Sequence, residues 1–399
     1  LIDPAAMRRI SPPLRSVLRP LLLFYWASVV SFLLMTMLLP RLSSYFEPHR
    51  DTFNWGMYQL VRLTQCVLLF ASVAATPLEA GRQRIIAKIA GVVLGLLCVG
   101  SVLTYTGVIP YEAVVAHLPA DKGVSGPWAD FGEDGDGVGL VSYNHAYTAC
   151  QLILAFAFYL SLTNHRLTAT SAVLAVATNL AVFVSASRAG FGALLVLNCV
   201  LAWSWVQLGV IRPFVAAGLI GALVAMLAVT LPSDLLPRTA VKVADETELL
   251  VSRQLTTFSG YESKNLSGRT QIWQQHLEGL NSRPYRWLVG RGFGTAIANG
   301  NNAHMLPLNI VSEMGLAGLL VCSLVMWRIL HLLWRHEPAG RPFFWGTVAL
   351  LLTSMTQETF YPVPSLDHFL GYFLMCSAIV IGINAGAASP AAAEQEPAA

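Results

Sequence analysis

The sequence predicts an all-α polytopic integral membrane protein with ten to twelve transmembrane helices and one large helical loop outside the membrane. Hydrophobic residues make up 55% of the 399 residues, and the mean hydropathy is +0.58. Charged residues make up 12%, whereas a soluble domain has about 25%. Apolar runs of about 20 residues, enough to cross a hydrocarbon core of about 30 Å, recur along the chain. This composition excludes a soluble globular protein.

Ten apolar runs are predicted to span the membrane, and short or re-entrant helices would raise the number to twelve. The predicted spans are residues 18–39, 55–76, 86–107, 138–160, 168–186, 189–209, 213–232, 307–333, 343–360 and 368–386. They form an N-terminal transmembrane bundle (1–232) and a set of C-terminal transmembrane helices (307–386), separated by a polar loop (233–306). The Ala-rich tail at 387–399 is predicted to be disordered.

Lys and Arg residues in the short connections determine the predicted orientation. One side of the membrane carries Arg8, Arg9, Arg15, Arg19, Arg82, Arg84, Lys88, Arg166, Arg212, Arg335 and Arg341. The other side carries only Arg41, Arg50, Lys122 and Arg188. Because basic residues are retained on the cytoplasmic side, both termini are predicted to be cytoplasmic, with loop 233–306 on the opposite side.

Loop 233–306 is too long to be a simple connector, so it is predicted to fold outside the membrane. Within GRTQIWQQHLEGLNSRP, helical spacing relates Ile272, Trp273, His276, Leu277 and Leu280. Asn281, Ser282 and Pro284 are predicted to end this amphipathic helix. The WLVGRGFG stretch that follows is not preceded by a strand–helix unit. It is therefore expected to be a flexible return to the membrane rather than a dinucleotide-binding turn.

Arg188 interrupts the run NLAVFVSASRAGFGALLVL at the boundary between two predicted spans. One interpretation is that its guanidinium extends to lipid phosphates, as arginines at span ends often do. The other is an anion site, in which Ser187, the N–H groups of the next helix and the guanidinium bind a phosphate ester. Both interpretations place Arg188 at the outer membrane boundary.

Three arginines of the loop are expected on the same side as Arg188. Arg269 begins the amphipathic helix, and Arg286 and Arg291 flank the WLVGRGFG stretch. Several arginines beside a bilayer suit a ligand with two or more negative charges and a lipid tail. A polyprenyl diphosphate has this chemistry.

Arg62 lies inside the second predicted span. An arginine at membrane depth is costly and normally faces the protein interior or an aqueous cavity. Either Glu358, in a structural ion pair, or a ligand phosphate would neutralise it.

His304 lies a few residues before the eighth predicted span, in NGNNAHMLPLNIVSEMG. A single histidine is most often structural. Here its place just above the membrane, close to Asn301 and Asn302, favours a role in accepting a proton from a hydroxyl group.

The six cysteines all fall within apolar runs, and no C-x-x-C pair or zinc-ligand spacing occurs in the sequence. Cysteines in such runs usually behave as small buried hydrophobic residues. The sequence therefore predicts no metal site.

The segments SASRAG, GRTQIWQQHLEGLNSRPYRWLVGRGFG and AHMLPLNIVSEMGLAGLL resemble the three signatures of the O-antigen ligase family. Its superfamily also includes O-antigen polymerases and bacterial protein O-oligosaccharyltransferases. The motif-level resemblance covers about residues 179–320. The chain departs from the family at Met305, where an Asn usually follows the histidine, so Asn301 or Asn302 is the candidate substitute.

The resemblance implies a membrane glycosyltransferase of the C type, acting at the periplasmic face of the bacterial inner membrane. It implies transfer of O-antigen from undecaprenyl diphosphate to lipid A–core oligosaccharide, with inversion and without metal or cofactor. Arg188 and Arg269 would bind the diphosphate, and His304 would activate the acceptor hydroxyl. Further substrate-binding candidates are Arg291, Arg286, Ser187, Asn302 and Arg62. The lipid bilayer is an expected partner, and nucleic acid is not.

Two other assignments stay open. A polymerase or protein O-oligosaccharyltransferase of the same superfamily would share the donor chemistry and differ in its acceptor. A transporter of lipid-linked glycans would place ionisable residues and broken helices near the membrane midplane. The predicted polar residues gather instead at the outer edge, which favours chemistry at the membrane surface.

Overall fold

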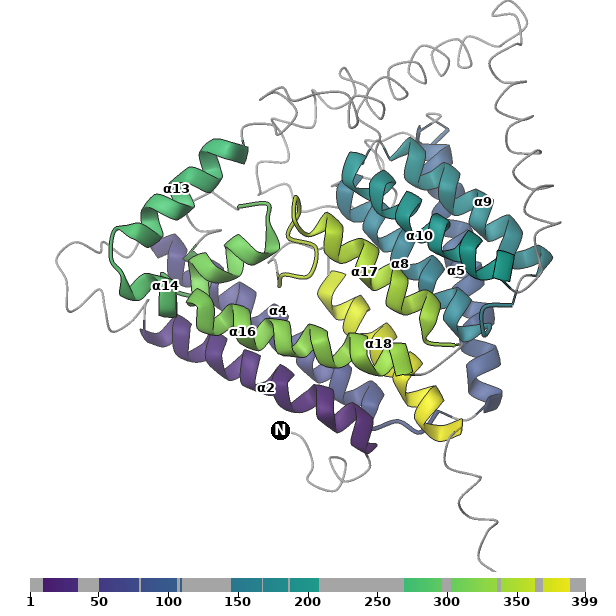
Figure 1. Ribbon diagram of the computed structural model, residues 1–399, viewed down its shortest axis with the longest axis horizontal. Helices are drawn as coiled ribbons and strands as arrows, with labels where there is room; N and C mark the ends of the chain where they lie inside the picture. Colours follow the sequence, from purple (N-terminus) through teal and green to yellow (C-terminus); the bar gives the residue numbers. More distant parts are fainter. Residues whose placement is uncertain are drawn as a thin grey trace, which may run out of the picture. The chain divides into compact units, whose positions relative to one another are not determined.

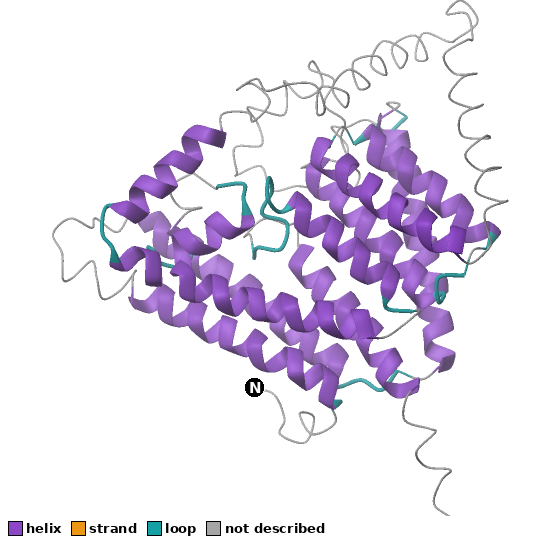
Figure 2. Cartoon of the chain, in the orientation of Figure 1, coloured by secondary structure: helices purple, strands orange, loops and turns teal. Residues whose placement is uncertain are grey.

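The computed structural model describes residues 10–34, 50–78, 80–105, 108–109, 145–166, 168–185, 187–207, 269–295, 303–335, 339–362 and 369–387. Every regular element in these ranges is a helix (Figure 2). Four described helices are long and apolar enough to cross a membrane: Pro12–Leu33, Gly56–Ala74, Gly81–Tyr105 and Leu306–Arg335. Four shorter apolar helices accompany them: Ala146–Leu162, Ala169–Val184, Ala189–Trp203 and Phe369–Ile383. The predicted class, an all-α polytopic membrane protein, is confirmed.

The chain divides into two compact units. The first comprises Leu1–Ile85, Leu266–Thr347 and Ser354–Ala399, and the second comprises Ile86–Asn265 and Val348–Thr353. Helix α17 (Arg341–Thr353) contributes residues to both units.

In the first unit, α2 (Pro12–Leu33) packs against α4 (Arg50–Ala74) and α16 (Leu306–Arg335), and α18 (Phe369–Ala387) packs against α4 (Figure 1). Two proline residues after Ser11 begin α2, where their missing N–H groups leave no helical bond unmade. Leu14, Leu18 and Leu21 are buried at helical spacing on one face of α2.

In the second unit, α8 (His145–Leu162) packs against α9 (Ala169–Val184) and α10 (Arg188–Gln207). A capping box of Thr168 and Ser171 begins α9, because each side chain bonds the other residue's main-chain N–H. The Asn198 amide donates a 2.7 Å hydrogen bond to Asn179 Oδ1 and joins α10 to α9. Helix α5 (Ala80–Tyr105) belongs to this unit from Ile86 onward.

Nine of the ten predicted spans coincide with described helices, and the tenth, 213–232, lies outside the described residues. The predicted C-terminal end of one span is wrong. The span predicted at 343–360 ends as a helix at Thr353, and residues 354–362 continue without helical structure. Polar side chains between Thr353 and Thr359, followed by Pro362, interrupt the apolar periodicity that a longer helix needs.

Helix α16 is broken at Gly315, whose backbone angles are φ +68° and ψ −171°. The preceding segment, Leu306–Met314, ends against the turn that follows the short helix α14 (Tyr285–Val289). The main-chain N–H of Arg291 donates to the Ser312 carbonyl at 2.8 Å, and that of Gly292 donates to the Glu313 carbonyl at 2.9 Å. These bonds satisfy carbonyl groups that lose their helical partners at the break.

Two glycines allow this contact between main chains. A Cβ atom on Gly315 would lie 2.2 Å from the Leu288 carbonyl group, and one on Gly290 would lie 2.3 Å from that of Glu313. Both residues have positive φ, which side-chain-bearing residues rarely adopt. The stretch WLVGRGFG, which we expect to be a flexible return to the membrane, is thus bound directly to α16 through its main chain.

We expect Gly315→Ala to destabilise the protein by about 3 kcal/mol, combining about 1–2 kcal/mol for the positive φ with about 1–3 kcal/mol for the overlap. The measurement is thermal unfolding in detergent. Gly81→Ala is the matched control, because a Cβ at Gly81 in the same unit meets no atom within 4 Å. Equal melting temperatures for the two variants would contradict the tight main-chain contact.

Candidate active site

The predicted amphipathic helix of the loop is present as α13 (Arg269–Asn281), and it ends where the sequence predicts. Its buried side contains His276 and Leu280, while Leu277 is 41% exposed and does not belong to that side as predicted. His276 Nδ1 lies 2.8 Å from Ser312 Oγ of α16. The contact fixes α13 beside the first turns of α16.

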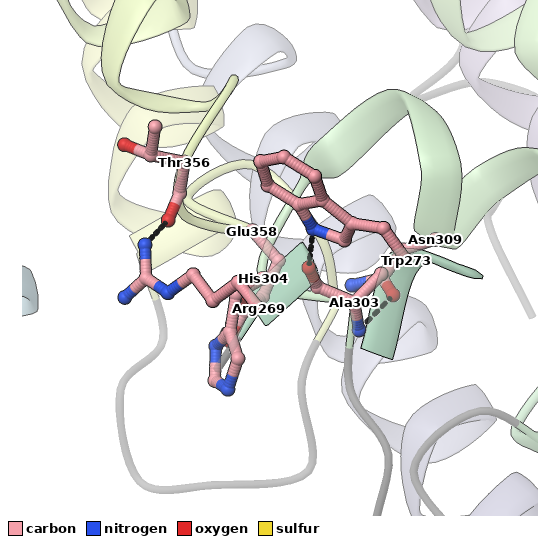
Figure 3. Close-up of polar contacts among 7 residues, drawn as sticks. All are labelled: Arg269, Trp273, Ala303, His304, Asn309, Thr356 and Glu358. Atoms are coloured by element: carbon pink, nitrogen blue, oxygen red, sulfur yellow. Dashed lines mark hydrogen bonds and ion pairs between the residues drawn. The ribbon is translucent and has the colours of Figure 1, made fainter. Parts of the chain in front are cut away.

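Arg269 is the first residue of α13, and its guanidinium donates a hydrogen bond to the main-chain carbonyl of Thr356 (Figure 3). Thr356 lies in the segment that follows α17. Since the predicted span continued to residue 360, this contact was not expected from the sequence.

His304 lies two residues before the start of α16, in a left-handed backbone conformation with φ +48°. Non-glycine residues with positive φ are uncommon and cluster at functional sites. The preceding residue, Ala303, is held at both of its main-chain groups (Figure 3). Its N–H donates to Asn309 Oδ1 at 2.9 Å, and its carbonyl accepts the indole N–H of Trp273 at 2.6 Å.

The imidazole of His304 is bound by a carboxylate. Its Nδ1 lies 3.2 Å from Oε2 of Glu358, whose side chain is 4% exposed, whereas that of His304 is 36% exposed. A carboxylate that accepts the Nδ1 proton fixes the ring orientation and makes Nε2 the basic nitrogen. This arrangement suits a histidine that accepts a proton from a hydroxyl group.

Arg269 and His304 therefore bind the same short segment, at Thr356 and at Glu358. All four residues belong to the first unit. The arrangement places a guanidinium and a carboxylate-bound imidazole on the segment after α17, next to the start of α16.

Arg188 begins α10 in the second unit, and its side chain lies outside what the structure describes. Ser187 is buried, and its hydroxyl accepts the main-chain N–H of Gly190 at 3.0 Å. This is the position and bond of a helix N-cap, so Ser187 stabilises the start of α10. Substrate binding by Arg188 and Ser187 stays a prediction.

Arg286 and Arg291 lie where α13, α14 and α16 meet. The Arg286 guanidinium donates to the Gly279 carbonyl at 3.0 Å and to Ser282 Oγ at 2.6 Å, which caps the C-terminal end of α13. Burial lowers the pKa of Arg291, an effect that the Glu313 carboxylate opposes and Arg286 reinforces. Substrate binding by Arg286 and Arg291 stays a prediction.

The structure describes only some of the remaining predicted residues. Arg62 lies on α4 and donates to Gln65 Oε1 at 3.2 Å, while Glu358, its suggested neutralising partner, is bound to His304. Asn301 and Asn302 lie outside the described residues.

Sequence reasoning missed two residues of this site. Asn309, five residues after His304, binds the main chain beside it. Glu358 binds the imidazole itself. The available signal for Glu358 was an acidic residue within the polar run TSMTQET at the end of a predicted span.

We expect Trp273→Phe to lower the local opening free energy of residues 303–309 by about 1 kcal/mol, because the Ala303 carbonyl loses its indole donor. Amide hydrogen exchange of this segment measures the effect. The control is Trp287→Phe, which removes an exposed bond to Asn281 Oδ1 and should leave exchange at 303–309 unchanged. Identical exchange in both variants would contradict the proposed anchoring.

Comparison with known proteins agrees with the motifs. Residues 170–323 match a protein-family model described as O-antigen ligase. The matched range includes α9, α10, α13, α14 and the broken start of α16, and it contains all three sequence signatures. No curated protein matches the chain. Over residues 170–323, the chain is therefore similar to the O-antigen ligase family.

Proposed function

We propose that this protein is a glycosyltransferase that transfers O-antigen from undecaprenyl diphosphate to lipid A–core oligosaccharide. The reaction takes place at the periplasmic face of the bacterial inner membrane, and both termini are cytoplasmic. The observation that carries the proposal is the carboxylate-bound imidazole of His304, which shares a binding segment with the Arg269 guanidinium. The family match over residues 170–323 supports the same class of enzyme.

His304 is assigned the acceptor side of the reaction. Its Nε2 accepts the proton of the attacking hydroxyl as the oxygen forms its bond to the anomeric carbon of the donor sugar. Glu358 holds the imidazolium that results, because a buried carboxylate beside Nδ1 stabilises the positive ring. A positioned base of this kind contributes about 10²–10⁴-fold to rate.

The arginines are assigned the donor side. The bond between the anomeric carbon and the diphosphate oxygen breaks with its electron pair on the diphosphate, and the configuration at the sugar inverts. Arg269 and Arg188 bind the leaving group and stabilise its growing charge. Arg62, Arg286, Arg291, Ser187 and Asn302 are proposed to support substrate binding. Diphosphate leaves without protonation, so the proposed reaction needs no general acid, and the arginine charges take the place of a metal ion.

Purified protein, reconstituted with undecaprenyl-diphosphate-linked glycan and lipid A–core, is expected to join the two without an ion gradient and in the presence of a chelator. His304→Ala is expected to lower kcat/KM by about 10²–10⁴-fold. Arg269→Ala and Arg188→Ala are expected to lower it by about 10²–10³-fold. Gel mobility of the lipid A–core product provides the measurement.

Arg84→Ala, which removes an exposed arginine on the predicted cytoplasmic side, serves as the matched control and should retain activity. Full activity of a well-folded His304→Ala protein would remove the histidine from the reaction. Chain extension of the lipid-linked glycan without lipid A–core would identify a polymerase, and transfer to a protein acceptor would identify a protein glycosyltransferase.

Glu358 allows a finer test of the acceptor side. Glu358→Gln keeps the shape of the side chain but removes its charge, so the imidazolium loses its counterion during proton transfer. We expect kcat to fall by about 10–10²-fold with little change in the donor KM. Glu358→Asp, which keeps the charge, should retain more activity than Glu358→Gln. Equal activity of wild type and Glu358→Gln would exclude a role for the pair.

A further inference from the structure

A second carboxylate, Glu313, is fully buried in the first unit and has no part in the reaction proposed above. Its Oε2 accepts two hydrogen bonds. Gln59 of α4 donates one through Nε2 at 3.1 Å, and the hydroxyl of Tyr361 donates the other. Gln59 and Tyr361 are also buried. A carboxylate in such a place is tolerated only when its oxygens are well bonded, so this cluster has a specific geometry.

Tyr361 connects this cluster to the candidate active site. Its main-chain N–H donates to the carbonyl of Glu358 at 2.9 Å and closes a turn over residues 358–361. Glu358 begins that turn and binds His304 with its side chain. The orientation of the Glu358 carboxylate therefore depends on where Tyr361 is held.

Tyr361 is held from two sides. Its hydroxyl is fixed by Glu313, and its ring packs at a tilt against Phe293, with 6.2 Å between centroids. Phe293 belongs to the turn that follows α14, residues 290–294, called the return turn below. Burial, with the Glu313 charge as a second cause, raises the pKa of Tyr361 well above its usual value. The phenol thus stays protonated and remains a hydrogen-bond donor at physiological pH.

Glu313 itself is fixed through its main chain. Its carbonyl accepts the N–H of Gly292 at 2.9 Å and the hydroxyl of Ser31 at 3.1 Å. The side chain therefore projects from a point anchored to both α2 and the return turn. A side chain that positions another group must itself be attached to a rigidly held main chain, as Glu313 is.

We propose that Glu313, Gln59 and Tyr361 form a positioning network that sets the turn at residues 358–361 and thereby holds the Glu358 carboxylate against the His304 imidazole. The effect of this network on catalysis rests on the proposed function. Its effect on the position of the Glu358 carboxylate does not. Glu313 and Tyr361 are positioning residues, since they act on the imidazole through Glu358.

Tyr361→Phe removes the phenol hydroxyl and keeps the ring that packs against Phe293. We expect kcat for glycan transfer to fall about 10-fold, with the donor KM unchanged within about twofold. In a Glu358→Gln background the same substitution should add almost nothing, because the group it positions is already lost. The control Tyr372→Phe alters an exposed tyrosine of α18 and should leave kcat unchanged. Additive losses in the double variant would overturn the proposal.

A second measurement does not depend on activity. The half-exposed His304 is accessible to diethyl pyrocarbonate, and mass spectrometry of nanodisc-reconstituted protein gives its rate of modification. Tyr361→Phe should raise this rate toward that of Glu358→Gln, and Tyr372→Phe should match wild type. A wild-type rate in Tyr361→Phe would overturn the network even if transfer activity is present. A raised rate without any transfer activity would support the network and count against the proposed function.

Substitution of Glu313 itself separates positioning from general loss of folding. Glu313→Gln keeps an oxygen that accepts the Tyr361 hydroxyl, and Glu313→Met keeps only the volume. We expect the His304 modification rate to stay near wild type in Glu313→Gln and to rise in Glu313→Met. Equal rates in the two variants, both well folded by gel filtration, would also overturn the proposal.

Discussion

The contact between two main chains, residues 288–292 and 312–315, is the constraint on which the first unit depends. A helix that breaks beside a membrane exposes carbonyl groups, and these groups must find donors within the protein. Here the donors are the N–H groups of Arg291 and Gly292. The two segments approach so closely that each of them requires a glycine, Gly290 in one and Gly315 in the other. The loop that carries α13 is thereby attached to the span that follows it.

The candidate site is a consequence of this attachment. Once α13 is held beside the start of α16, Trp273 reaches the main chain next to His304, and Arg269 reaches the segment after α17. That segment supplies Glu358 to the imidazole. Groups far apart in the chain thus meet without any of them lying in the middle of a long apolar helix. The site uses helix ends and the short connections between them, where polar groups are least costly.

Much of the fold could be predicted from the sequence, because apolar run length and helical periodicity report directly on burial. These signals located the described spans and both ends of α13. They did not locate the end of α17, although the mostly polar run at residues 354–359 is itself a signal against a longer helix. The family resemblance named Arg269 and His304, whereas Asn309 was not singled out and Glu358 was expected as a partner of Arg62 rather than of His304. Their roles depend on hydrogen bonds whose geometry no spacing rule encodes, and in the case of Glu358 the partner lies more than fifty residues away. The predicted meeting of Arg188 with these residues stays a prediction.

The left-handed backbone of His304 carries an implication for how this chain tolerates change. An L-residue with a branched or ring-bearing side chain is strained in that conformation, and glycine would relieve the strain. Directed evolution toward heat resistance alone would therefore favour loss of the imidazole at this position. Selection that retains both properties must instead compensate elsewhere in the molecule, so at this position stability is opposed to the proposed role of the imidazole.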